Sequence, residues 1–258
     1  MVGPALAGAL SLKDLHVDAR FGHLRIDNFS VPFFAAALLG LVMFFIALRW
    51  LPESLLARGP QTSEVVVPPD WRGLGPLLGL ALAAQFGLTL FEATFALYAQ
   101  AKFNYGLAQV GTVFVVCGLV MTVFQVGLVG FLSGRVREIY QIGVGFGLMG
   151  LSLALLSTAG STFAVVGLVG TLALGTAFVS PNLAALISKR GGKHRVGAAL
   201  GIQNAANSLG QVLGPLLGGA LFLWQANAPY LLTGALLSAV ALVVGWRALG
   251  GQRGVRLA

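Results

Sequence analysis

Charged side chains are scarce in this chain of 258 residues. Only 9% of the residues are Asp, Glu, Lys or Arg, whereas soluble domains contain about 25%. Hydrophobic residues make up 57% of the chain, and its mean hydropathy is +0.88. This composition excludes an ordinary soluble domain and predicts a polytopic membrane protein with the lipid bilayer as its solvent.

Cysteine and acidic residues are also scarce. The single cysteine, Cys117, lies inside an apolar run, so the sequence has no disulfide framework. Two histidines, His16 and His23, stand in a polar segment with aspartates, which is more typical of a solvated loop than of a metal site. The 16 basic residues outnumber the eight acidic ones, but they stand between apolar runs, where they indicate membrane topology. We therefore predict no metal, no cofactor and no nucleic-acid partner.

Seven apolar runs are long enough to span a bilayer, which takes about 20 residues of helix. They are predicted at residues 31–51, 73–100, 107–129, 139–158, 162–187, 196–223 and 229–249. Residues 1–10 are apolar but too short to span, so we expect the stub of a helix there, followed by a polar loop over residues 11–30. The four prolines of residues 52–72 indicate a linker. The last six runs form a bundle over residues 73–250, with a tail over 251–258.

Basic residues are divided unequally between the two sides of these runs. When the loops alternate from side to side, one side holds Lys13, Arg20, Arg25 and Lys102. The other side holds the remaining twelve, which are Arg49, Arg58, Arg72, Arg135, Arg137, Lys189, Arg190, Lys193, Arg195, Arg247, Arg253 and Arg256. The positive-inside rule then predicts that the linker and the C-terminus are cytoplasmic and that residues 11–30 are extracytoplasmic.

Small residues recur at regular spacing between residues 201 and 219. The glycines at 210, 214 and 218 lie on one helical face, which would let a neighbouring helix approach closely. Many polytopic proteins have such a face. The longer pattern, G-x8-G-x3-G-P-x2-G-G, is more specific and is formed by Gly201, Gly210, Gly214, Pro215, Gly218 and Gly219.

This longer pattern resembles the antiporter motif of the major facilitator superfamily, which occurs in helix five of its drug:proton antiporters and is often repeated in helix eleven. A shorter copy, Gly3-Pro4-Ala5-Leu6-Ala7-Gly8, opens the chain. The resemblance implies an all-α fold built from two parallel six-helix halves. It identifies residues 1–10 as the end of helix five, 31–51 as helix six and 73–250 as helices seven to twelve. We therefore expect that the chain lacks the first four helices.

A second resemblance lies in residues 130–137. They are similar to the second copy of the family's cytoplasmic signature G-x-L-x-D-R-x-G-R and keep Gly130, Arg135 and a nearby basic residue, Arg137. Gly134 replaces the acidic residue of the signature, which puts its charge relay in doubt. Two basic residues that anchor a short cytoplasmic turn explain the segment equally well.

A third resemblance surrounds Glu92. Residues 91–98 have the pattern F-E-x-x-F-x-x-Y, which looks like helix seven of drug-efflux members. The aromatic residues Phe91, Phe95 and Tyr98 have helical spacing, so ordinary core or lipid packing is an equally good interpretation.

Glu92 is the only acidic residue inside an apolar run. An ionised carboxylate at the middle of a bilayer costs on the order of 2.5–3.5 kcal/mol on insertion scales, unless it is paired, protonated or in a wet cavity. No Lys or Arg occurs between residues 73 and 100, so we predict that Glu92 takes up and releases the coupling proton. The alternative is a solvated carboxylate near the helix end.

Uncharged polar residues in the other runs are candidates for the substrate path. Gln203, Asn207 and Gln211 recur every four residues and form a polar stripe beside the glycine face. Gln125 and Asn182 lie in two other runs. Each of these side chains could instead hydrogen bond between helices.

The sequence therefore predicts part of a proton-coupled secondary active transporter that exports small, hydrophobic compounds across a bacterial cytoplasmic membrane. Its partners would be protons, a small-molecule substrate and an N-terminal half. The alternatives are an uptake transporter of the same superfamily, and a transport-inactive fragment or structural membrane partner. A membrane enzyme is the weakest alternative, because the apolar runs contain no pair of histidines or aspartates and no Ser/Lys dyad.

Overall fold

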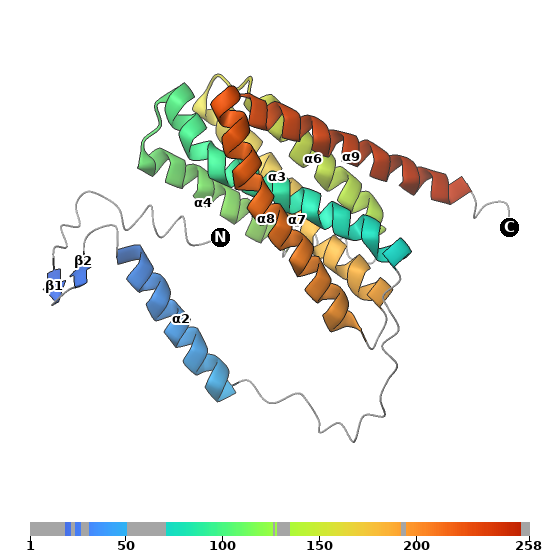
Figure 1. Cartoon of the computed structure of the whole chain (residues 1–258), viewed down its shortest axis with the longest axis horizontal. Helices are drawn as coiled ribbons and strands as arrows, with labels where there is room; N and C mark the ends of the chain where they lie inside the picture. Colours follow the sequence, from blue (N-terminus) through green and yellow to red (C-terminus); the bar gives the residue numbers. More distant parts are fainter. Residues whose placement is uncertain are drawn as a thin grey trace. The chain divides into compact units, whose positions relative to one another are not determined.

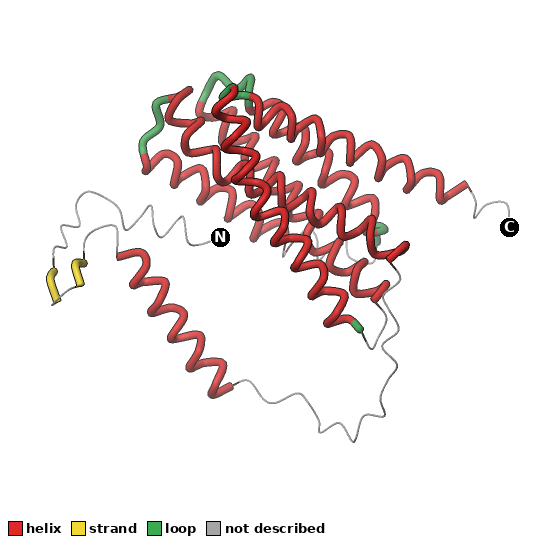
Figure 2. The backbone as a smooth tube through the Cα atoms, in the orientation of Figure 1, coloured by secondary structure: helices red, strands yellow, loops and turns green. Residues whose placement is uncertain are grey.

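The computed structural model of the chain describes residues 19–21, 24–26, 31–50, 71–125, 127, 135–191 and 195–253. Its secondary structure is helical apart from one pair of very short strands (Figures 1 and 2). The predicted helix stub at residues 1–10, most of the linker at 52–72, Gly130 and the end of the tail lie outside the described residues. The chain divides into two compact units, Met1–Pro68 and Pro69–Ala258.

The first unit contains one long apolar helix, α2 (Val31–Trp50). Its 20 residues reach about 30 Å at 1.5 Å per residue, which matches the hydrocarbon thickness of a bilayer. The strands β1 (Ala19–Phe21) and β2 (Leu24–Ile26) precede it and pair antiparallel, with Arg20 opposite Arg25. Within the polar segment at residues 11–30, the described residues thus form a short antiparallel strand pair.

The second unit is a bundle of helices that pack around one core (Figure 1). Its described helices are α3 (Trp71–Phe103), α4 (Leu107–Phe124), α6 (Glu138–Leu156), α7 (Thr162–Gly191), α8 (Val196–Trp224) and α9 (Ala228–Arg253). The most extensive interfaces join α3 to α8, α6 to α9 and α6 to α7. Helices α3, α7 and α9 each continue beyond the predicted apolar run, because flanking polar residues complete their last turns.

Six helices of the described residues, namely α2, α3, α6, α7, α8 and α9, are long and apolar enough to cross a membrane, and α4 is a shorter apolar helix. The fold class is therefore the predicted one, an all-α polytopic membrane protein. Many large apolar side chains are exposed, including Leu242 at 75% and Trp246 at 78%, which is expected where the solvent is lipid rather than water.

Helix α3 ends at a residue with left-handed backbone geometry. Asn104 has φ 55°, a conformation that asparagine tolerates better than most residues. Its amide donates to the Gln100 carbonyl at 3.0 Å, and the Tyr105 amide donates to the Ala99 carbonyl at 3.2 Å. Helix α4 then begins after Gly106, whose amide donates to Oε1 of Gln109 at 2.8 Å. These bonds make a tight turn between two antiparallel helices.

The aromatic series of α3 lies in the core of the bundle. Phe91, Phe95 and Tyr98 are at most 1% exposed. The Phe91 and Phe95 rings lie 4.9 Å apart, and both contact Phe114 of α4. The Tyr98 ring is 4.6 Å from that of Tyr230 on α9. Core packing therefore accounts for the helical spacing of these residues.

Candidate functional site

The glycines of the candidate antiporter motif hold α8 against α3. A Cβ atom at Gly210 would lie 2.8 Å from the Leu82 carbonyl oxygen and 2.9 Å from the Phe86 amide nitrogen. At Gly214 it would lie 2.8 Å from the Leu90 amide nitrogen. The two backbones are thus nearly in contact, and Oγ1 of Thr89 donates a hydrogen bond to the Gly210 carbonyl at 3.1 Å. Close approach of this kind gains van der Waals contact between helices in lipid.

Gly218 extends this contact, because a Cβ there would lie 3.0 Å from Cγ of Leu90 and 3.1 Å from Cγ2 of Thr94. The remaining positions of the motif do not take part in it. A Cβ at Gly201 or Gly219 would have nothing within 4 Å among the described residues, and Pro215 is exposed. Similar glycine contacts occur elsewhere: a Cβ at Gly145 of α6 would lie 2.7 Å from the Gly175 carbonyl oxygen of α7. Close packing through glycine is therefore a general device of this bundle.

Glu92 lies on the side of α3 that the rest of the described bundle leaves exposed. It stands between Leu90 and Thr94, the residues opposite Gly214 and Gly218, so it is at the level of the glycine contact. Helix α3 continues to Phe103, about 16 Å beyond Glu92. The carboxyl group is thus well inside the helix. It makes no hydrogen bond or ion pair with a described residue.

The three polar residues of α8 differ in their surroundings. Gln203 is buried at 7% exposed, Asn207 is half-buried and Gln211 is exposed. A step of four residues in a helix of 3.6 residues per turn rotates a side chain by about 40°. The stripe therefore turns away from the helix contact, and Gln211 is its most accessible member.

The remaining polar candidates lie apart from Glu92 in different environments. Gln125 is exposed at the end of α4. Asn182 of α7 is 6% exposed, and its Nδ2 donates to Oε1 of Gln141 on α6 at 3.1 Å and to the Phe178 carbonyl at 2.7 Å. Gln141 in turn donates to the Val136 carbonyl at 3.0 Å. Asn182 thus bridges two helices with both amide hydrogens in use.

The segment that resembles the cytoplasmic signature is described from Arg135 onwards. Arg135 and Arg137 are exposed and precede α6, and the Arg137 guanidinium lies 5.9 Å from the centre of the Tyr140 ring. The next residue, Glu138, forms an ion pair with Lys189 of α7. Glu138, which directly follows Arg137, therefore joins the start of α6 to α7 through an ion pair.

A polar cluster at the opposite end of the bundle was not predicted from the sequence. The hydroxyls of Thr94 and Tyr230 are 3.0 Å apart. The Tyr98 hydroxyl donates to the Leu156 carbonyl at 3.2 Å and accepts from Nζ of Lys102 at 2.9 Å. The members of this cluster come from α3, α6 and α9, and contacts between different helices leave no pattern in the sequence. Only the contact between Tyr98 and Lys102 was predictable, because these residues are four apart on one helix.

Comparisons with known proteins agree with the motif. The chain is 28% identical over 234 residues to multidrug resistance protein 1 of Bacillus subtilis and 29% identical over 239 residues to multidrug resistance protein 2 of the same species, with 88% of this chain covered in each case. It is 26% identical over 228 residues, 86% of its length, to the quinolone resistance protein NorA of Staphylococcus aureus. The chain spans about three fifths of the length of these relatives, 58–59%.

A family model gives the same result over most of the chain. The model of the Major Facilitator Superfamily matches residues 1–215 and, in a second and overlapping match, residues 77–254. These matches include the glycine face of α8 and the position of Glu92. Together with the helical bundle and the three relatives, they show that this chain is an integral membrane protein that belongs to the major facilitator superfamily.

Proposed function

We propose that this chain is part of a proton-coupled transporter that exports small, hydrophobic compounds. The names of the relatives, two multidrug resistance proteins and a quinolone resistance protein, support export of this class of compound. The observation that carries the proton coupling is the position of Glu92: its carboxyl group is exposed on α3 far from either helix end and has no ionic partner among the described residues. Intramembrane acids of this kind serve as proton relays in transporters.

We propose a substrate path along the exposed sides of α3 and α8. Gln211 and Asn207 contribute polar groups to this path, and Gln125 would contribute from α4. Asn182 and Gln203 are buried, and we assign them to contacts between helices. Hydrogen bonds to Gln141 and to the Phe178 carbonyl satisfy the amide group of Asn182 within the bundle.

We also propose that the bundle works with an N-terminal six-helix half. The relatives are longer than this chain. In addition, α8 has large exposed apolar side chains, among them Leu209 at 57%, Val212 at 65% and Leu216 at 64%, which suit a second bundle. Alternating access needs two halves that rock about a site between them.

Efflux from whole cells tests this function. Bacterial cells that express this chain together with an N-terminal half are loaded with a fluorescent hydrophobic cation or with a quinolone, and loss of the compound is followed over time. We expect efflux that a protonophore abolishes. Accumulation driven by the proton gradient would indicate the uptake alternative, and the absence of any movement would favour a structural membrane partner.

We further propose that the linker and the C-terminus are cytoplasmic, in the cytoplasmic membrane of a bacterium. The division of Lys and Arg supports this orientation. Single cysteines placed at Asn28 and Ser63 in a Cys117→Ala background test it, since Cys117 is the only cysteine and is 3% exposed. An impermeant maleimide added to intact cells should label Asn28→Cys and label Ser63→Cys only after permeabilisation. Equal labelling in intact cells would contradict the orientation.

A further inference from the structure

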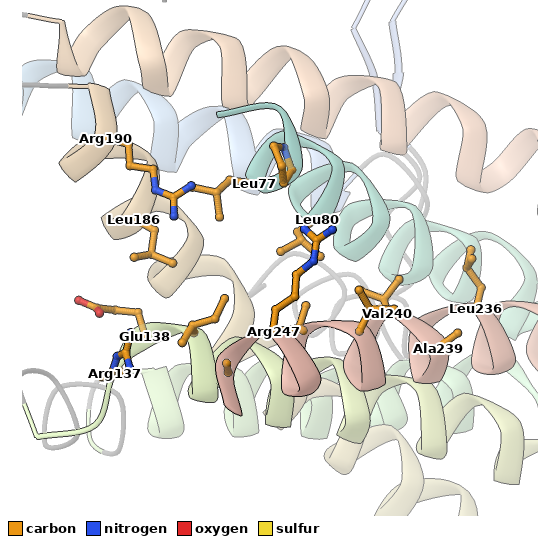
Figure 3. Close-up of a pocket in the computed structure, with 15 residues that line it drawn as sticks. Leu77, Leu80, Arg137, Glu138, Leu186, Arg190, Leu236, Ala239, Val240 and Arg247 are labelled. Atoms are coloured by element: carbon orange, nitrogen blue, oxygen red, sulfur yellow. The ribbon is translucent and has the colours of Figure 1, made fainter. Parts of the chain in front are cut away.

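A cavity of about 750 Å³ lies between α3, α6, α7 and α9 (Figure 3). Most of its lining is aliphatic. In Figure 3, Leu77 and Leu80 of α3 face the cavity from one side, and Ala239, Val240 and Arg247 of α9 face it from the other. The volume is in the range of pockets that hold small organic ligands, roughly 300–1,000 Å³.

The cavity exists because α3 and α9 separate towards one end of the bundle. Nearer the other end they are in contact: a Cβ at Gly87 would lie 2.7 Å from Cδ1 of Leu237, and Thr94 contacts Tyr230. Towards the start of α3 this contact gives way to the cavity, while α9 stays attached to α6 through the Tyr140 hydroxyl, which donates to the Ala248 carbonyl at 3.2 Å. The result is a groove along α9.

Most of the groove is lined by apolar side chains, and one end of it is lined by cationic side chains. Leu236, Val240, Val243 and Arg247 lie on one face of α9, and the twelve residues from Leu236 to Arg247 extend about 16 Å. Leu236 and Val243 are 49% and 51% exposed. At the end of this face, three arginines line the groove, namely Arg137, Arg190 and Arg247.

The positive charge of this end is not balanced by the described bundle. After residue 70 the sequence has only two acidic side chains, Glu92 and Glu138. Glu138 also lines the groove, where Lys189 engages it in an ion pair. Arg190 uses one N–H group for the Gly73 carbonyl at 2.6 Å and retains others for a ligand. Arg247 forms no hydrogen bond or ion pair with another residue that the structure describes.

We propose that this groove binds an anionic phospholipid, with the phosphate at Arg137, Arg190 and Arg247 and an acyl chain along Leu236, Val240 and Val243. Arginine pairs with phosphate through two parallel hydrogen bonds, which favours it at such sites. Basic pockets between membrane helices bind anionic headgroups. The bilayer supplies, at high local concentration, lipids that combine an anionic headgroup with apolar acyl chains. This site is distinct from the path proposed above, and its occupancy can be measured without transport.

Native mass spectrometry of the detergent-purified protein tests the proposal. Phosphatidylglycerol and phosphatidylcholine with the same acyl chains are added separately, and we expect at least one phosphatidylglycerol molecule to be retained in preference to phosphatidylcholine. Arg247→Gln should weaken phosphatidylglycerol binding about fivefold, since one cation near a membrane surface contributes about that factor. Arg195→Gln is the matched control, because it removes the same charge from the start of α8, outside the groove.

A second variant tests the contribution of the apolar groove to lipid binding separately from that of the arginines. Ala239→Trp keeps all three arginines and fills the apolar part, so it should also reduce retention of phosphatidylglycerol. Equal binding of the two lipids, or an unchanged affinity in both Arg247→Gln and Ala239→Trp, would overturn the proposal. Displacement of the lipid by millimolar inorganic phosphate would show a site for a free anion instead, and that result would overturn it too.

Discussion

Replacing Gly214 by valine is expected to separate α8 from α3 and to unfold the bundle at a markedly lower temperature. The new Cβ would lie 2.8 Å from the Leu90 amide nitrogen and 3.0 Å from the Phe86 carbonyl oxygen. Both are backbone atoms, so no side-chain rotation can relieve the clash. Overpacking of this kind costs about 1–3 kcal/mol and occasionally more. Thermal unfolding of the purified protein, followed by tryptophan fluorescence, measures the effect.

Gly219→Val is the matched control for this prediction. The same side chain is added five residues further along α8, at a position where a Cβ would have nothing within 4 Å. The change in intrinsic helix propensity is the same for both variants, so the difference in unfolding temperature reports the contact with α3. If the two variants lose the same stability, close packing at Gly214 is not what holds α8 to α3.

Replacing Glu92 by glutamine is expected to abolish proton-driven efflux while the protein stays folded and inserted. Glutamine has nearly the same shape but cannot exchange a proton, and the Glu92 side chain makes no hydrogen bond with a described residue that the change would break. The measurement is efflux from cells or proteoliposomes at several imposed pH gradients, with the amount of membrane-inserted protein determined in parallel.

Two variants control the Glu92 experiment. Glu92→Asp keeps a carboxyl group on the same side of α3 and should retain a dependence on the proton gradient. Glu138→Gln removes the other acidic side chain among the described residues of the bundle, which is half-buried and paired with Lys189 at a helix start. It should leave coupling intact, because an ion pair with this much solvent contact contributes little. If the Glu92→Gln variant transports the compound with an unchanged dependence on the proton gradient, Glu92 is not the coupling acid.

The helices were predictable because their signal is local. Hydropathy over about 20 residues and the flanking Pro, Gly and charged residues define α2 and α6 to within one residue at their starts. The described ends of α3 and α9 lie a few residues beyond the predicted runs. Their last turns include polar residues such as Lys102. A prediction based on hydropathy ends at the last apolar residue and therefore misses these turns.

The roles of individual polar residues were less predictable. Asn182 and Gln211 looked equivalent as uncharged polar residues in apolar runs, yet Asn182 is 6% exposed and bonded to Gln141, whereas Gln211 is exposed. The partner of Asn182 is 41 residues away on another helix. No spacing within one helix indicates such a pair.

The sequence by itself determined the membrane environment, the positions of the helices, the glycine face of α8 and the isolation of Glu92 from basic residues in its own helix. These features depend on side-chain chemistry and on the 3.6-residue period. Only the tertiary structure decided which face of α3 is covered, which polar residues are consumed in helix contacts, and that Arg137, Arg190 and Arg247 meet at one groove. Those outcomes depend on how helices far apart in the chain pack, because burial and charge proximity are properties of the assembled bundle.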